Sequence, residues 1–239
     1  MSGSQFNVRL TDGVARVDLG RPEEGNAMTR AMMVELARLL GDLGRDESVR
    51  VVAIEGRGPQ FCRGRDGKGE NRTGMTPYEV RVKLMGAVLG VYQAVADVPV
   101  PVVACVHGDA LGFGAAMAVG CDITLAAGNA RFAFPEIEHD IPPTMAMCAA
   151  LGKVQSKALT YLIYSAEHID AQHAVELGLA SKVLPQATFA AEADAFLTKL
   201  ASRPRLVLET IKRYQAKASH LTPEMASEYA GTLLALVRS

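Results

Sequence analysis

Apolar positions in the first 135 residues switch between the spacing of strands and the spacing of helices. Short apolar or alternating runs, typical of strands, occur at residues 6–10, 14–19, 51–54, 101–106, 123–125 and 131–134. The first two runs flank a turn at residues 11–13 and predict a hairpin. The third and fourth are continuously apolar, as expected of strands that are covered on both faces.

Two segments between these runs carry apolar residues at helical spacing. Thr29 can cap the first predicted helix, whose apolar positions are Met32, Met33, Leu36, Leu39, Leu40 and Leu43. Pro77 opens the second, whose apolar positions are Val80, Leu84, Val88, Val91 and Val95. From Thr144 onward the pattern is helical almost throughout. We therefore expect an α/β core followed by a helical C-terminal layer, part of which packs on a neighbouring subunit.

Length, composition and charge narrow the class of protein. The chain has 239 residues, of which 49% are apolar, and no tryptophan, so one large aliphatic domain with at most a small appendage is expected. Lys and Arg number 25 against 26 Asp and Glu, which argues against a general nucleic-acid binder. The uncharged stretch at residues 110–121 is too short to cross a bilayer. We expect neither nucleic acid nor membrane as a partner.

The cysteines and the N-terminal residues bear on metal binding and on location. The four cysteines lie far apart, without a C-x-x-C pair or a zinc-like spacing, so no metal site is expected. Residues 1–5 have neither a basic nor an apolar segment, so no secretory signal is expected. A cytoplasmic location fits both observations.

Two glycine-bearing turns, at residues 61–66 and 110–114, follow apolar segments. Glycine at a strand-to-helix turn lets backbone N–H groups point at a ligand, and the helix N-terminus adds partial positive charge. One N–H group from each turn would together bind an oxyanion. On spacing alone, two tight turns packed on a sheet are the simpler explanation. Neither turn has the fingerprint of a nucleotide-binding loop.

Several motifs in a fixed order resemble the crotonase (enoyl-CoA hydratase/isomerase) family. They lie at residues 21–28, 61–66, 106–114, 121–123, 134–137 and 169–183. The resemblance implies a spiral of β-β-α units over residues 1–185 and a helical oligomerisation region over residues 186–239, forming a trimer or a dimer of trimers. It also implies an enzyme that acts on an acyl-CoA thioester without a prosthetic group, coenzyme A being part of the substrate.

The same resemblance gives roles to individual residues. The amides of Arg65 and Phe113 would hold the thioester oxygen, although the family usually has glycine in place of Phe113. Glu136 matches the second of two glutamates that family hydratases use, and the position of the first is occupied by Ala116. One carboxylate can still carry a proton from one carbon to another. Isomerase is therefore favoured over hydratase, with Glu136 as the proton shuttle.

Other functions remain open. His139 or Asp140 would supply a second acid or base and permit hydration, hydrolysis or decarboxylation, whereas two charges on a surface loop explain the same residues without chemistry. A non-catalytic paralogue that binds acyl-CoA or a partner protein also accounts for Ala116.

A basic segment suits the phosphates of coenzyme A. Residues 57–72 carry five Lys and Arg against two Asp and Glu, a local charge of +3 in a chain of net charge −1. The family positions that would face the coenzyme A are Asn26, Ala27, Arg63, Asp66 and Lys68. A solvated basic loop explains the same charges without a ligand.

Overall fold

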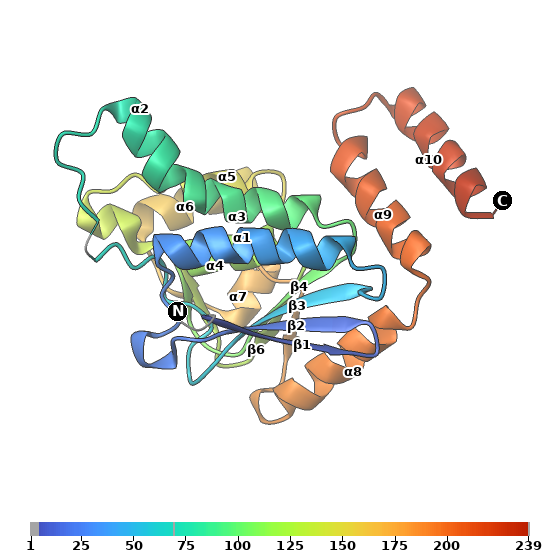
Figure 1. Cartoon of the computed structure of the whole chain (residues 1–239), viewed down its shortest axis with the longest axis horizontal. Helices are drawn as coiled ribbons and strands as arrows, with labels where there is room; N and C mark the ends of the chain where they lie inside the picture. The colour runs from blue at the N-terminus through green and yellow to red at the C-terminus, as the bar shows by residue number, and fades with distance from the viewer. Residues whose placement is uncertain (1–4, 69, 239) are drawn as a thin grey trace.

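The computed structural model describes residues 5–68 and 70–238, and six of its strands form one sheet in the order β1-β2-β3-β4-β6-β9 (Figure 1). The strands are β1 (Phe6–Thr11), β2 (Val14–Leu19), β3 (Val51–Gly56), β4 (Val102–Val106), β6 (Ile123–Ala127) and β9 (Lys182–Leu184). β1 is antiparallel to β2, as the predicted hairpin requires, and the other neighbours are parallel.

Helices cover both faces of this sheet, which explains the continuous apolar runs in its central strands. Val52 and Ile54 face the larger cluster, to which α1 (Arg30–Arg45), α3 (Gly86–Asp97) and α4 (Phe113–Gly120) contribute. The alternate residues of β3 and β4 face a smaller cluster with α8 (Phe189–Ala201). Figure 1 shows α8 on the opposite side of the sheet from α1 and α3. The predicted α/β core is confirmed.

A second, smaller sheet positions the candidate site. It consists of β5 (Ala110–Leu111), β7 (Arg131–Ala133) and β8 (Ile169–Asp170). Two isolated bridges extend it, because Cys62 pairs with Ala110 and Arg65 pairs with Met28. The remaining helical segments are η1 (Pro22–Glu24), α2 (Pro77–Glu79), η2 (Val80–Met85), η3 (Pro135–His139), α5 (Thr144–Ala150), α6 (Ser156–Ser165), α7 (Ala171–Leu177) and η4 (Gln186–Thr188).

Two details of the secondary structure differ from a simple helical pattern. The segment after Thr144 is almost all helical, as predicted, but it also contains the short strands β8 and β9. Strands of two or three residues are too short to produce a readable alternation, which is why the pattern missed them. The helix predicted from Pro77 contains a π-helical stretch, η2, so that Val80 is only half-buried while Leu84 is buried.

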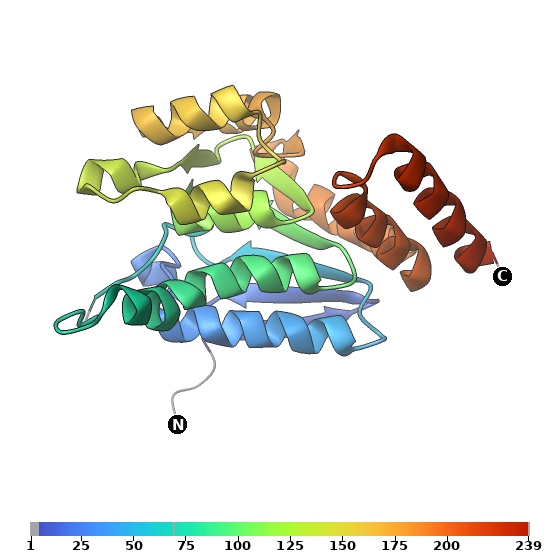
Figure 2. The ribbon, with the colours of Figure 1, turned by 90° about the horizontal axis from the view of Figure 1, so that it is seen from above.

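The C-terminal region is helical, as predicted, and its last two helices project from the body. The predicted boundary after residue 185 falls before α8, which packs on the sheet. Figures 1 and 2 show α9 (Arg205–Ala218) and α10 (Pro223–Arg238) as a separate hairpin at one side of the molecule. Lys212 connects α9 to the core, since its Nζ lies 2.7 Å from an Asp122 oxygen and donates to the Val95 carbonyl at 2.9 Å. The assembly role of this region stays a prediction.

Candidate functional site

Three chain segments meet along the small sheet. The extended segment of residues 61–66 pairs on one side with Met28, whose N–H donates to the Gly64 carbonyl at 2.9 Å. On its other side the Leu111 N–H donates to the Cys62 carbonyl, also at 2.9 Å. β5 in turn pairs with β7, and Glu136 lies three residues after the end of β7. Both predicted turns and the predicted carboxylate therefore come together in one place.

The backbone N–H of Arg65 points away from Met28. Gly64 and Asp66, its two neighbours, make the hydrogen bonds to Met28, and successive residues of an extended segment direct their N–H groups to opposite sides. The Arg65 amide consequently faces the side on which β5 ends and α4 begins. Among the described residues, no acceptor pairs with it.

The backbone N–H of Phe113 opens toward the same place. Phe113 is the first residue of α4, so its N–H has no acceptor within the helix, and none is found elsewhere in the described chain. A Cβ atom built on Gly64 would lie 3.9 Å from the Phe113 nitrogen. Gly114 permits this approach, because a Cβ there would lie 2.1 Å from the Cys62 carbonyl oxygen. The two unpaired amides thus converge.

The Glu136 carboxylate lies over Gly112, the residue that precedes Phe113. A Cβ atom on Gly112 would be 2.9 Å from Glu136 Oε1. Glu136 Oε2 is buried and has no hydrogen-bond partner among the described residues. Burial raises the pKa of Glu136, and a hydrogen bond from its own backbone amide offsets part of that shift. A carboxylate in this environment is a stronger base than one in water and is free to accept a proton.

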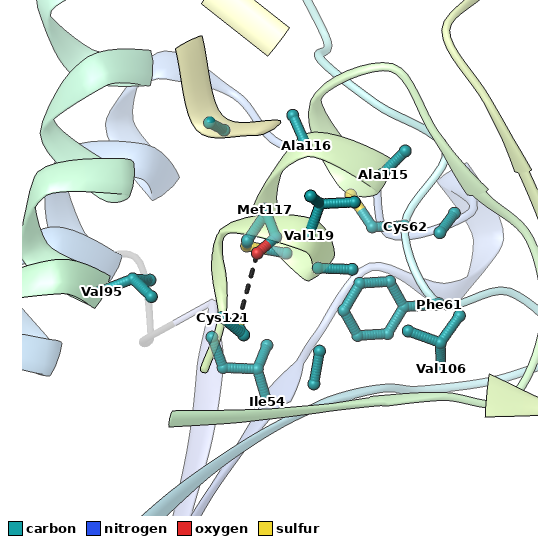
Figure 3. Packing of buried hydrophobic residues seen from close by; sticks show 14 of the residues in the cluster. Ile54, Phe61, Cys62, Val95, Val106, Ala115, Ala116, Met117, Val119 and Cys121 are labelled. Atoms are coloured by element: carbon teal, nitrogen blue, oxygen red, sulfur yellow. Dashed lines mark hydrogen bonds between the residues drawn. The ribbon is translucent and has the colours of Figure 1, made fainter. Parts of the chain in front are cut away.

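Ala116 and Phe113 are both accommodated in the apolar core. Ala116 is fully buried, and Figure 3 shows it among the apolar side chains around α4. Phe113 is 5% exposed, and its ring stacks on that of Tyr92 in α3 with a centroid distance of 5.7 Å. The side chain at position 113 therefore packs on a neighbouring helix, and its backbone N–H is left available.

His139 and Asp140 lie on the surface. Both are exposed at the end of η3, and within the described chain neither side chain makes a hydrogen bond or an ion pair. Asp140 has a positive φ of 57° and ends the short helix. The structure brings neither residue into contact with the two amides, which favours the interpretation as a solvated loop.

Asn26 and Asp66 are occupied in holding the loops together. Asn26 is fully buried, and its side-chain amide donates to the carbonyls of Arg57 and Gln60, each at 2.8 Å. An Asp66 oxygen lies 3.0 Å from Arg21, and the Lys68 amide together with the Arg21 guanidinium holds the pKa of Asp66 below its ordinary value. Their side chains shape the loop, so their predicted contact with coenzyme A would have to come from the backbone.

Part of the basic segment remains available to a ligand. Glu70 pairs with the side chain of Arg65, and Arg57 lies 3.8 Å from Asp18. Arg63, Lys68 and Arg72 are exposed, and none forms an ion pair with a described residue. Ala27, the residue before Met28, is half-buried. Three cations without an ion pair among the described residues thus lie within ten residues of the Arg65 amide in sequence.

Sequence reasoning missed Tyr92. Its position next to Val91 in an apolar helical stripe gave no signal beyond that of a core aromatic residue. The structure places its ring against Phe113, and the charge of Glu136 is one cause of the raised pKa of its phenol, after burial.

Other parts of the described chain carry no comparable arrangement. A cavity of about 880 Å³ lies beside α8 and includes none of the predicted site residues. Within residues 5–68 and 70–238, His, Cys, Asp and Glu side chains form no group of three or more suited to a metal ion. In the same residues, every helix is too short or too polar to span a bilayer.

Comparisons with known proteins agree with this geometry. The family described as "Enoyl-CoA hydratase/isomerase" matches residues 9–234. The rat "Enoyl-CoA hydratase domain-containing protein 3, mitochondrial" is 29% identical over 87% of this chain and 70% of its own length. A crystal structure of an enoyl-CoA hydratase from Mycobacterium smegmatis superposes with a TM-score of 0.90 at 30% identity, covering 97% of this chain and 90% of that one.

Two Escherichia coli relatives bear names that specify different reactions. The "1,2-epoxyphenylacetyl-CoA isomerase" is 30% identical over 84% of this chain and 78% of its own length. The "2,3-dehydroadipyl-CoA hydratase" is also 30% identical, over 88% of this chain and 81% of its own length. Identity at this level leaves the choice between the reactions to the residues of the site.

Proposed function

The chain belongs to the enoyl-CoA hydratase/isomerase family, and we propose that it transfers a proton at the carbon next to the carbonyl of an acyl-CoA thioester. The observation that supports this is the convergence of two unpaired amides, from Arg65 and Phe113, beside the half-buried carboxylate of Glu136. The amides would hold the thioester oxygen, and the carboxylate would act as the base.

The proposed reaction is the shift of a double bond between 3-enoyl-CoA and 2-enoyl-CoA. Glu136 removes a proton from C2, and the electron pair of that C–H bond passes into the thioester, so that negative charge develops on its oxygen. The two N–H groups stabilise this oxyanion, each contributing about 3–4 kcal/mol in comparable sites. Glu136 then returns the same proton to C4, so the reaction needs no external acid, oxidant or metal.

Ala116 favours isomerisation over hydration. A hydratase with two carboxylates can divide the activation of water and the protonation of C2 between them. Of the two positions at which family hydratases carry glutamates, this chain has a carboxylate at Glu136, whereas position 116 is a fully buried alanine. A hydratase working through Glu136 alone is the second candidate. A hydrolase or decarboxylase that uses His139 or Asp140 is less favoured, because both side chains are exposed.

The central experiment is an isomerase assay with Glu136→Gln. Purified wild-type protein should interconvert 3-enoyl-CoA and 2-enoyl-CoA, and the variant should lose the activity, since an amide cannot accept the proton. Glu138→Gln, two residues away and exposed, is the matched control and should keep it. Full activity in Glu136→Gln would refute the proposed mechanism. Tight acyl-CoA binding by the wild type without turnover of any enoyl, hydroxyacyl or oxoacyl thioester would instead identify a non-catalytic paralogue.

We further propose that Arg63, Lys68 and Arg72 bind the phosphates of coenzyme A. Their support is exposure together with the lack of an ion pair in the described chain. Lys68→Ala should raise KM several-fold at low salt and leave kcat unchanged, whereas Lys157→Ala, on an exposed part of α6, should change neither. Equal KM values for the two variants would argue against this phosphate site.

The hairpin of α9 and α10 is proposed to join copies of the chain into a trimer or a dimer of trimers. An apolar groove of about 480 Å³ between the two helices is lined by Ile211, Leu233 and Leu234, among others. A double variant, Ile211→Asp with Leu234→Asp, should have a lower mass by light scattering. Leu151→Asp, at an exposed leucine outside the hairpin, should keep the wild-type mass. A cytoplasmic location stays a prediction beside the mitochondrial name of one relative.

A further inference from the structure

Tyr92 lies against the candidate site from a helix that contributes neither amide. It belongs to α3, and its ring stacks on the ring of Phe113 with an angle of 21° between their planes. Phe113 carries one of the two converging amides. The phenol is therefore joined to the site through the residue that would hold the thioester oxygen.

The face of α4 that Tyr92 covers is also the face of Ala116. Phe113 and Ala116 are three residues apart in one helix, and residues at this spacing lie on the same side. On that side, the methyl group of Ala116 is small and buried. Tyr92 consequently brings a hydroxyl group to a region in which α4 itself supplies no polar side chain.

The Tyr92 hydroxyl is available to a ligand. Among the described residues it has no hydrogen-bond partner, and it is not one of the fully buried atoms that lack a partner. Burial of the ring and the charge of Glu136 both raise the pKa of the phenol. The group therefore keeps its proton at neutral pH and acts as a hydrogen-bond donor.

On the basis of the proposed function, we propose that the Tyr92 hydroxyl binds an oxygen atom at C3 of the acyl group. In this proposal the thioester oxygen lies on the Phe113 amide and C2 lies at Glu136, and the next carbon of the acyl chain is directed toward the stacked rings of Tyr92 and Phe113. The preferred ligands would be thioesters with a hydroxyl or carbonyl group at C3, or a 2-enoyl thioester with a water molecule held there.

These two sources of the oxygen have different consequences for the chemistry. An oxygen that belongs to the acyl group makes Tyr92 a specificity-determining residue. A bound water that adds to C3 forms the new C–O bond, gives one proton to Glu136, and Glu136 passes that proton to C2. In the second case the hydrogen bond from Tyr92 orients the water, and one carboxylate is sufficient for hydration.

The test compares full-length wild-type protein with Tyr92→Phe, which keeps the stacked ring and removes only the hydroxyl. Calorimetric titration with 3-hydroxybutyryl-CoA should show about tenfold weaker binding in the variant, the ratio expected from one ordinary hydrogen bond. Binding of butyryl-CoA, which has no oxygen at C3, should stay within about twofold. If the oxygen is that of a water molecule, the variant binds each of the two ligands as tightly as the wild type does. In that case its kcat for hydration of crotonyl-CoA falls about tenfold at unchanged KM.

Tyr161→Phe is the matched control, because Tyr161 lies on the exposed side of α6 and its hydroxyl donates a hydrogen bond to Glu167. It should change none of these quantities. The role of Tyr92 is overturned if Tyr92→Phe leaves both the ligand preference and the hydration rate unchanged, or weakens both ligands equally. If Glu136→Gln is inactive while that result is found, the proposed function stands and only the role of Tyr92 fails. If the wild type binds neither ligand, both fail.

Discussion

Gly112 supports the Glu136 carboxylate, and Gly112→Ala perturbs it with a single methyl group. The backbone of Gly112 has φ 51° and ψ −117°, a conformation that residues with a Cβ atom rarely adopt. The added Cβ would lie 2.9 Å from Glu136 Oε1, whereas ordinary contacts begin near 3.4 Å. The substitution therefore strains the backbone and pushes the carboxylate away from its place.

The two effects have separate magnitudes. Strain at such a backbone position costs about 1–3 kcal/mol, and each kcal/mol lowers Tm by about 2–4 °C in a chain of this size. The carboxylate must retreat by about half an ångström to restore an ordinary contact. Because a misplacement of about 1 Å can cost about 10²-fold in rate, we expect kcat to fall by about ten- to a hundredfold.

A matched glycine separates strain from displacement. Gly152 also has a positive φ, 73°, but a Cβ atom there would meet nothing within 4 Å. Gly152→Ala should lower Tm by a similar amount and keep the isomerase activity. Thermal unfolding and steady-state kinetics on both variants measure the two effects. If Gly112→Ala keeps the wild-type kcat, the carboxylate over Gly112 is not the group that moves the proton.

Three further predictions rest on other contacts. Burial raises the pKa of Glu136, so the folded chain favours the protonated carboxyl. The free energy of unfolding therefore falls as the pH rises through the folded-state pKa and the carboxyl loses its proton. Glu136→Gln should raise Tm at about pH 8 and lose this advantage at about pH 4, and equal shifts at both pH values would contradict it. Burial raises the pKa of the Cys62 thiol to about 12, and Cys148 is the exposed cysteine, so a thiol reagent at neutral pH should modify one thiol in the native chain and all four after denaturation. Lys212→Met leaves Asp122 without its cation and should cost about 2–3 kcal/mol in urea unfolding, below the cost at a fully buried pair because Asp122 is partly exposed; a cost under about 0.5 kcal/mol would show that the pair does not anchor α9.

The sequence was most informative where a pattern repeats over many residues. The hairpin, the buried strands and the long helix after Thr29 all follow from apolar spacing, and Thr29 caps that helix by accepting from the Met32 amide. The two glycine-bearing turns also lie next to each other in the structure, and their role as a pair of oxyanion-binding amides stays a prediction. In each case a backbone requirement, such as a covered strand or a close approach at Gly114, leaves a direct trace in residue type.

The sequence was least informative about short strands and about where side chains point. β8 and β9 are strands because they form hydrogen bonds with β7 and β6, respectively. Their two or three residues carry no periodic signal. Asn26, expected to face coenzyme A, uses its side chain to join two loops, which depends on backbone groups more than thirty residues away. His139 follows Glu136 by three residues and yet is exposed. Such directions are fixed by tertiary packing.

Phe113 and Ala116 are best understood as one linked departure from the family pattern. They lie on the same face of α4, where the stacked rings of Phe113 and Tyr92 take up space beside a buried methyl group. A carboxylate at position 116 would have to enter this apolar cluster, where an unpaired charge is costly. A large side chain at position 113 therefore goes with a small one at position 116. The lack of a carboxylate at position 116 and the position of the Tyr92 phenol, which has no hydrogen-bond partner among the described residues, are then linked by the same packing. This packing joins the question of the reaction to the question of the acyl group.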